Sequence, residues 1–372
     1  MKQKILKKYA NITKNDIFKS FFLLFLAILT IFVFINSYYL QFIINGFYQI
    51  FDANIQVYYL NVGQASASVV IFPNGSSMII DTGSQDSEAE FLKSVDLIFS
   101  QNKIKHLDYL VLTHSDEDHV GGAVGLLEKY QVYTIYRPKI LSQSKLENEN
   151  TNGLMEVDTF VYAEVMTSVL SEPNCDVLFV EDSTMKMGHE TTLRFWAAKN
   201  TIYSQTNSYS PFITIDYAEK TFMFTGDAPE VREKEFLAEL EDKNISVNVD
   251  FLAVSHHGSK SSSTMEFLQE IKPQYAFISA GDVQHPTDEV LDRLEEVGVE
   301  DVFVTKNCGM VAVGVDQNQN IVIKFEARFV DLPLICVIMC CFAFIVANIN
   351  LNDRKTLFSH KKIKNLYKIK DN

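Results

Sequence analysis

The sequence contains little cysteine and no excess of basic residues. Its 372 residues include five cysteines, too few for a disulfide-stabilised scaffold. Lys and Arg number 33 against 47 Asp and Glu, which gives a formal net charge of −14. This balance argues against a generic basic nucleic-acid-binding protein. The length fits one large domain or two ordinary ones and suffices to bury a core without disulfides.

Apolar segments lie near both ends of the chain. We predict a transmembrane helix with its linker at residues 20–51, because the charge-free run that begins at Phe21 is long enough to cross a bilayer. A cleaved signal peptide is the alternative, but no small-residue cleavage motif follows. Residues 329–349 predict a second transmembrane helix. Asp331 and Pro333 near its start leave an interfacial or packed helix as the competing interpretation.

Both terminal tails are basic. Residues 1–19 hold six Lys and one Asp, and residues 350–372 hold seven Lys or Arg and two Asp, so each tail carries +5. Residues 20–349 therefore carry about −24 (−14 − 10). Basic residues beside a membrane span mark its cytoplasmic side. We expect a cell-membrane protein that contacts the bilayer, with both termini cytoplasmic and residues 52–328 extracytoplasmic. Solvated, nucleic-acid-binding or lipid-binding tails are the alternative.

The central region, residues 52–328, mixes strand and helix patterns. Strands are expected at residues 55–60, 68–72, 77–81, 109–112, 212–217, 221–225, 251–254 and 275–279, and near 301–305, 310–315 and 320–326. Helical spacing is found at residues 88–101, from 119 onward, and at 153–170, 230–240, 264–271 and 287–296. Two mixed sheets packed face to face, with helices outside, would satisfy this order.

A dense group of potential metal ligands follows one buried strand. His114, Asp116, Asp118 and His119 fall within six residues of one another. Alternation along an extended loop would put His114 and Asp116 on one side, with Asp118 and His119 turned towards the other as a helix begins. Imidazole and carboxylate ligands together suit Zn²⁺, Mn²⁺ or Fe. An acidic helix N-terminus would explain the aspartates but not both histidines.

Other polar groups also follow predicted strands. Asp81 lies in an Asp-Thr-Gly sequence, Asp227 in a Gly-Asp sequence, and His256 and His257 in a Ser-His-His-Gly-Ser sequence. Strand ends at one edge of a sheet can assemble a site. Asp81 would alternatively be structural, hydrogen-bonding the ligand loop.

Together these motifs resemble the metallo-β-lactamase superfamily, and most closely the hydrolase domain of ComEC-type DNA-uptake proteins. The resemblance rests on residues 60–83, 113–122, 225–227, 255–263 and 284–294, and covers nearly all of residues 52–328. It implies an α/β (α+β) fold, an αββα sandwich of two mixed sheets with a dinuclear metal site. Two single spans cannot form the multi-span pore of such proteins, so we do not expect an ordinary uptake channel.

The resemblance also implies the ligands of two divalent ions, Zn or Mn. The first ion would be bound by His114, Asp116 and Asp227. The second would be bound by Asp118, His119, Asp227 and His256. Asp227 would bridge the two, and His257 could be the ligand in place of His256.

The chain departs from the superfamily pattern at one further histidine ligand. The equivalent place holds Asn207 to Ser210, so the first ion would have fewer protein ligands. We expect Asn207, Ser210, Ser259 and Lys260 to contact substrate, although Ser259 and the serines after it could form only a flexible polar loop. The catalytic residues implied are Asp118, His257 and His285, with one of the two histidines protonating the leaving group.

These expectations predict a membrane-anchored, metal-dependent hydrolase. A phosphodiesterase or nuclease acting outside the cytoplasm through a metal-activated water is favoured by the resemblance. The acidic charge opposes a DNA substrate and favours the alternative of a smaller phosphorylated or ester-bearing envelope molecule. A catalytically inactive membrane-tethered binding module is the third hypothesis.

Overall fold

The computed structural model describes Phe22 and residues 53–140, 160–200, 203–281 and 284–325. Apart from Phe22, these residues belong to one compact unit, residues 47–327. Within the described ranges no helix is both long and apolar enough to cross a membrane. The two predicted membrane helices, except for Phe22, and both basic tails lie outside these ranges, so they remain predictions.

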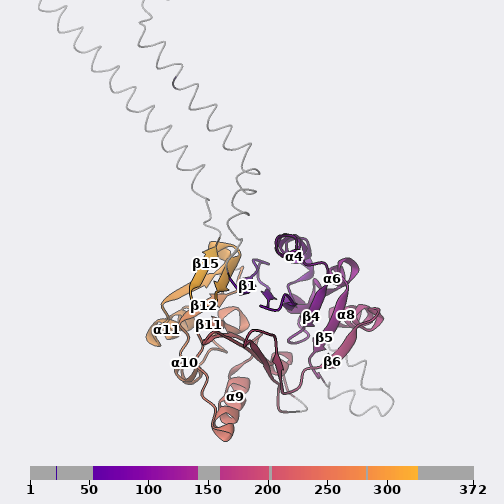
Figure 1. Ribbon diagram of the computed structural model, residues 1–372. Coiled ribbons are helices and arrows are strands. Elements are labelled where there is room, and N and C mark those ends of the chain that lie inside the picture. The colour runs from indigo at the N-terminus through magenta and orange to yellow at the C-terminus, as the bar shows by residue number, and fades with distance from the viewer. Residues whose placement is uncertain (1–21, 23–52, 141–159, 201–202, 282–283, 326–372) are drawn as a thin grey trace, which may run out of the picture. The chain divides into compact units, whose positions relative to one another are not determined.

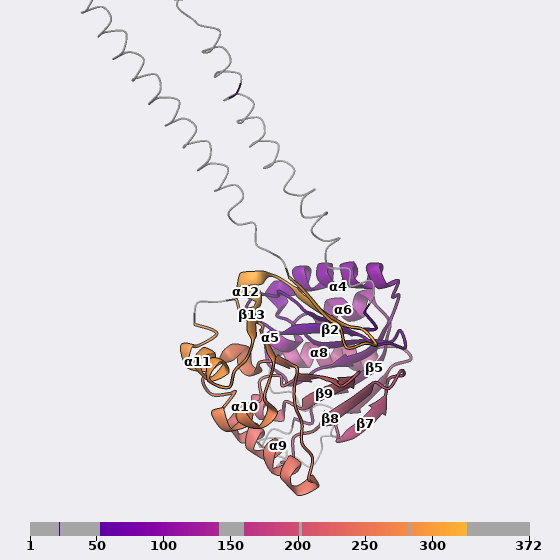
Figure 2. The same ribbon diagram turned by 60° about the vertical axis from the view of Figure 1, so that its left-hand side comes forward.

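Two mixed sheets form the centre of the fold (Figures 1 and 2). The first contains β1 (Ile55–Tyr59), β2 (Ala67–Ile71), β3 (Ser77–Thr82), β4 (Leu107–Val111), β5 (Val132–Arg137), β6 (Asp176–Phe179), β14 (Val311–Val315) and β15 (Ile321–Phe325). Its strand order is β15-β14-β1-β2-β3-β4-β5-β6. The pairs β3–β4, β4–β5 and β5–β6 are parallel, and the remaining pairs are antiparallel.

The second sheet has seven strands in the order β13-β12-β11-β10-β9-β8-β7. They are β7 (Ser183–Lys186), β8 (Thr192–Trp196), β9 (Phe212–Tyr217), β10 (Lys220–Phe224), β11 (Phe251–Ala253), β12 (Tyr275–Ile278) and β13 (Asp301–Val304). The pairs from β10 to β13 are parallel, and those from β7 to β10 are antiparallel.

Helices cover the outer face of each sheet (Figures 1 and 2). The first sheet carries α4 (Glu88–Asn102), α5 (Glu117–Val120), α6 (Ala123–Lys129) and α8 (Phe160–Ser171). The second carries α9 (Glu230–Lys243), α10 (Met265–Ile271) and α11 (Asp288–Glu296), while α12 (Thr305–Cys308) is a single turn after β13. The predicted sandwich of two mixed sheets with helices outside is therefore confirmed.

The core has two parts. Between the sheets, Tyr59 of β1 stacks on Phe277 of β12 with ring centroids 4.1 Å apart. Beneath the helices of the second sheet, Phe236 and Phe267 pack against the outward-facing residue Phe212. Burial on both faces explains why the parallel strands carry near-continuous apolar sequences.

The topology brings the polar strand ends together. The carboxyl ends of β3 and β4 in one sheet and of β10 and β11 in the other lead directly into the residues singled out above. The site is therefore built from both halves of the sandwich.

Candidate metal centre

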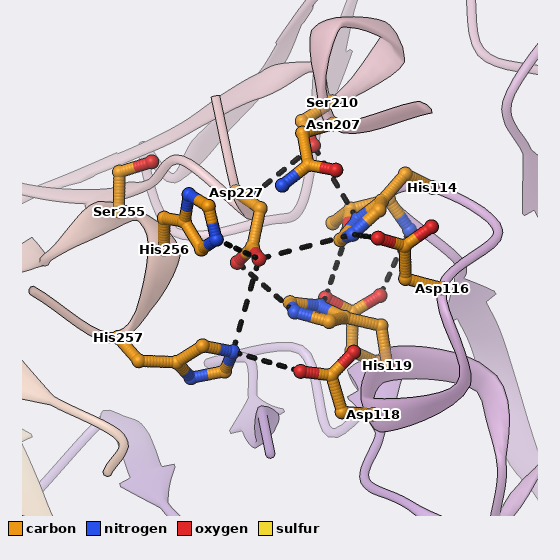
Figure 3. A network of polar contacts seen from close by, with 12 residues as sticks. His114, Asp116, Asp118, His119, Asn207, Ser210, Asp227, Ser255, His256 and His257 are labelled. Carbon is orange, nitrogen blue, oxygen red and sulfur yellow. Dashed lines mark hydrogen bonds and ion pairs between the residues drawn. The ribbon is translucent and has the colours of Figure 1, made fainter. Parts of the chain in front are cut away.

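The carboxylate of Asp227 faces four histidines (Figure 3). Its Oδ1 is 3.0 Å from Nε2 of His119. Its Oδ2 is 3.7 Å from Nε2 of both His256 and His257, and 3.9 Å from Nε2 of His114. The structure thus brings together predicted residues from three separate segments of the chain.

Four of these side chains form a compact group of potential ligands. Asp118, His119, Asp227 and His257 each offer one ligand atom, and these atoms lie within 4.8 Å of one another. His257 is in this group, whereas His256 is not. The side chain of His257 is 4% exposed and that of His256 is 32% exposed.

The hydrogen bonds of His257 fix its orientation. Its Nδ1 donates to the backbone carbonyl of Ser279 at 2.8 Å, which leaves Nε2 directed at Oδ2 of Asp118, 3.1 Å away. A histidine whose Nδ1 is held by a carbonyl presents the Nε2 lone pair to a metal. Nδ1 of His256 instead lies 3.3 Å from Oγ of Ser261, at the more exposed side of the site.

The backbone at the two histidines is left-handed. His256 and His257 have φ of +52° and +54° in the short turn η4 (Ser255–Gly258) that follows β11. Such a conformation is uncommon for non-glycine residues and costs about 1–3 kcal/mol at each position. Their rings lie 6.2 Å apart and 69° out of parallel, so the two adjacent imidazoles have different orientations.

Asp81 supports His119 from behind. Its Oδ2 accepts a hydrogen bond from Nδ1 of His119 at 2.7 Å, and its two oxygens accept from the backbone N and Oγ1 of Thr113, each at 2.8 Å. Asp81 is 1% exposed. It contacts the ligand loop rather than the centre of the site, as the structural alternative for this residue predicts.

His114 and Asp116, the ligands predicted for the first ion, also lie beside Asp227. Nε2 of His114 is 3.7 Å from Oδ2 of Asp116. Because Oγ1 of Thr113 donates its hydrogen to Asp81, it accepts from Nδ1 of His114 at 3.0 Å, which leaves Nε2 facing the site. Asp116 accepts a hydrogen bond from Oγ1 of Thr206 at 2.7 Å.

The segment that replaces the missing histidine lies here as well. Oγ of Ser210 accepts from the backbone N of Asp227 at 3.2 Å and lies 3.5 Å from Nδ1 of His114. Figure 3 shows the amide of Asn207 pointing towards the space between His114 and Asp227. Both residues are part of the centre, although neither supplies an imidazole.

The other predicted substrate contacts lie further out. Ser259 is linked to Ser261 by a 3.0 Å hydrogen bond, and Ser261 contacts His256, while Lys260 is exposed. The backbone carbonyl of His285 accepts a hydrogen bond from Lys306. Burial lowers the pKa of His256. The nearby histidines His257, His119 and His285 lower it further.

The pKa values of the two histidines that follow β4 are shifted in opposite directions. Burial, and then His119, lower the pKa of His114 to about 4. Burial acts in the same direction on His119, but Asp227 and Asp81 outweigh it and hold the pKa of His119 well above its ordinary value. Burial opposes ionisation of Asp227, but His119 and His257 outweigh it and hold its pKa well below the ordinary value. The centre is thus a cluster of carboxylates and histidines that favours bound positive charge.

The donor set fits divalent metal ions. Nε2 of His114 is buried and makes no hydrogen bond among the described residues, and the buried Nε2 of His119 faces only the carboxylate of Asp227, 3.0 Å away. A buried polar atom without a hydrogen bond is costly, and a cation bound by both imidazoles and the carboxylate would satisfy these atoms. Imidazole with carboxylate is a zinc or manganese ligand set.

Comparison with known proteins agrees with this geometry. Residues 60–282 match the family model of the metallo-beta-lactamase superfamily. The chain belongs to the metallo-beta-lactamase superfamily. Members of this superfamily are generally metal-dependent hydrolases that bind one or two divalent ions, and the centre around Asp227 is the candidate metal site.

Two relatives agree with the ComEC-type branch expected from the motifs. The chain is 26% identical to Recombination protein 2 of Haemophilus influenzae over 288 residues, 76% of this chain and 32% of that protein. It is 28% identical to ComE operon protein 3 of Bacillus subtilis over 217 residues, 55% of this chain and 24% of that protein. The chain therefore covers about a third or less of the length of these relatives.

A solved structure of low sequence identity is also similar. The metallo-beta-lactamase fold protein YhfI of Bacillus subtilis is 14% identical, with a TM-score of 0.44 over 69% of this chain and 99% of that one.

Proposed function

We propose that this superfamily hydrolase is a dinuclear, membrane-anchored phosphodiesterase whose centre acts outside the cytoplasm. The observation that carries the proposal is the compact group of Asp118, His119, Asp227 and His257, together with Nε2 of His114, which lies 3.9 Å from the same Asp227 carboxylate and 3.7 Å from Asp116. One carboxylate between two sets of ligands is the arrangement that a bridging ligand requires.

Residues of this chain would hold two ions. Asp118, His119, Asp227 and His257 would bind one, and His114, Asp116 and Asp227 the other. We therefore assign His257, rather than His256, as the ligand. When bound, such a pair supplies Lewis acidity and an ionised water at neutral pH, the chemistry of phosphoester hydrolysis.

The protein residues around the ions would then bind and orient the substrate. Nδ1 of His257 donates to Ser279 and its Nε2 would bind an ion, so neither nitrogen would be free to protonate a leaving group. His285 is the remaining histidine of the predicted pair, and we assign the proton-donating role to it. Ser259 and Lys260, on the exposed side of His256, would contact phosphate oxygens, and Asn207 and Ser210 would contact substrate beside His114.

The favoured substrate is DNA. Sequence similarity to Recombination protein 2 and ComE operon protein 3 supports it. The charge supports the second candidate, a small phosphodiester or ester of the cell envelope, because residues 20–349 carry about −24 and would repel a long polyanion. The retained ligands count against a third candidate, an inactive binding module.

The test uses the full chain in detergent with Mn²⁺ or Zn²⁺ added. We expect about two ions per chain and cleavage of a phosphodiester, with activity lost in His114→Ala and Asp116→Ala. Cleavage of small diesters but not of single- or double-stranded DNA would favour the second candidate. A chain that binds no metal would refute both enzymatic candidates.

Membrane topology needs a separate experiment. We propose that residues 52–328 are extracytoplasmic and both tails cytoplasmic. Protease added to intact cells should cleave the central domain and spare epitopes placed on both tails. Cleavage of the tails alone would show the opposite orientation.

A further inference from the structure

Helix α9 begins three residues after Asp227 and carries two adjacent buried charges. Arg232 is 0% exposed and Glu233 is 1% exposed. The contacts of these two side chains go to different loops, one on each side of the metal centre. Buried charges are costly unless they are fully hydrogen-bonded, so two in succession require a structural reason.

Arg232 binds the segment between β8 and β9, next to His114 and Asp116. Its Nη2 donates to the backbone carbonyls of Trp196 and Ala197 at 3.1 and 3.2 Å, and its Nε donates to the carbonyl of Ser210 at 3.2 Å. Its Nη1 donates to Glu235 at 3.0 Å. The planar guanidinium therefore joins the end of β8 to the start of β9.

This contact holds the described residues that lead up to Ser210, residues 203–210, against α9. The joined segment contains η3 (Thr206–Tyr209), from which Thr206 hydrogen-bonds Asp116, and it ends at Ser210, which hydrogen-bonds the backbone of Asp227. Among the described residues, Arg232 has no contact with the metal ligands proposed above. It determines where Thr206 and Ser210 lie, and through them the His114 and Asp116 side.

Glu233 binds the loop that follows the two histidines. Its Oε2 accepts from Oγ1 and the backbone N of Thr264 at 2.6 and 3.0 Å, and its Oε1 accepts from the backbone N of Ser263. Arg293 of α11 donates to the carbonyls of Ser262 and Ser263 at 3.0 and 3.2 Å. The serine-rich loop is thus fixed at its far end rather than flexible there.

We propose that Arg232 and Glu233 are positioning residues of the metal centre, Arg232 for the His114–Asp116 side and Glu233 for the loop that carries His256 and His257. Since α9 starts next to Asp227, one helix turn sets the distance from the bridging carboxylate to both flanking loops. The inference rests on the proposed dinuclear function only in that it requires two bound ions.

The test compares metal binding by full-length variants in detergent. Arg232→Met removes the guanidinium group. Arg232→Lys keeps the positive charge, and Glu233→Gln replaces one carboxylate oxygen by an amide nitrogen. Matched controls lie on the same helix: Lys234→Met and Glu230→Gln alter an exposed ion pair, whose side chains are 60% and 55% exposed. Metal content, Mn²⁺ affinity and the electron paramagnetic resonance spectrum of the Mn²⁺ form are measured.

Arg232→Met should reduce metal content from about two ions towards one and replace a spin-coupled spectrum by that of isolated Mn²⁺. Arg232→Lys should restore part of the coupled signal. Glu233→Gln should weaken Mn²⁺ binding about 10-fold, the magnitude typical of losing support behind a ligand. Both controls should match the wild type.

Hydrogen exchange of the metal-free proteins gives a readout that does not depend on metal. Arg232→Met should speed exchange in residues 203–210, and Glu233→Gln in residues 259–264. Variants that melt earlier but keep two ions, wild-type affinity and wild-type exchange in these loops would overturn the inference. A wild type that binds fewer than two ions would refute the dinuclear function instead, and the exchange data would still decide the role of the two residues.

Discussion

The Nδ1 atom of His119 lies 2.7 Å from a carboxylate oxygen of Asp81, a residue 38 positions earlier in the chain. A carboxylate only accepts, so Nδ1 carries a hydrogen, and the Nε2 that faces Asp227 is the nitrogen that would lose its proton to bind a metal. The same carboxylate also holds the backbone of Thr113 at the start of the ligand loop. One side chain therefore sets both the tautomer of a ligand and the position of its loop.

Asp81→Asn should weaken metal binding about 10–100-fold, the range found when support behind a metal ligand is removed. The amide cannot accept all three hydrogen bonds. Asp108→Asn is the matched control, because Asp108 accepts hydrogen bonds from Ser77 near the amino-terminal ends of β3 and β4. Titration with a metal indicator should show a change for Asp81 only. Equal affinities in the two variants would contradict this role.

His257→Ala should cost far more metal affinity than His256→Ala. Only His257 belongs to the compact ligand group, and only its Nδ1 is held by a backbone carbonyl. Metal content after dialysis should fall in His257→Ala and stay near the wild-type value in His256→Ala. His106, which is half-buried and pairs with Asp108 outside the site, provides a control variant. The reverse order of the two variants would restore His256 as the ligand.

Metal binding at pH 7 should release protons. Burial opposes the charged form of His119 and His257, but the surrounding aspartates outweigh it, so both have a raised pKa in the metal-free protein. A raised pKa means that the ring keeps its proton at higher pH, and ligation requires the neutral ring. Affinity should therefore increase with pH. Calorimetry in two buffers of different ionisation enthalpy measures the protons released, and equal heats in both buffers would contradict the prediction.

Gly226→Ala should destabilise the fold more than Gly75→Ala. Both glycines have positive φ, +50° and +85°, which costs a non-glycine residue about 1–2 kcal/mol. At Gly226 an added Cβ would also lie 2.9 Å from the side chain of Thr113, and overpacking adds about 1–3 kcal/mol. At Gly75 no atom lies within 4 Å of the added Cβ. Urea unfolding of the two variants measures the difference.

Most strands and helices could be predicted from the sequence because their apolar residues recur with a clear period. The strands expected at residues 212–217 and 221–225 correspond to β9 and β10 almost residue for residue. The strands expected from the sequence did not include β5 to β8. Of these, β6 and β7 have four residues each, lie at the edges of their sheets and are largely exposed, so neither carries an apolar alternation.

The ligands could be predicted because their residue types cluster, but their supporting partners could not. Thr206 contacts Asp116 across 90 residues of sequence, and Ser279 contacts His257 through a backbone carbonyl that any residue would offer. The choice between His256 and His257 depends on left-handed backbone geometry, which adjacent identical residues do not reveal.

The ligands of the candidate centre come from opposite halves of the sandwich. His114, Asp118 and His119 follow a strand of the first sheet, while Asp227 and His257 follow strands of the second. An ion bound among them would cross-link the two sheets at their shared edge. Because such an ion binds the native fold and not the unfolded chain, it would add to folding stability by mass action. The resistance of this domain to unfolding would then vary with the metal supply of its surroundings.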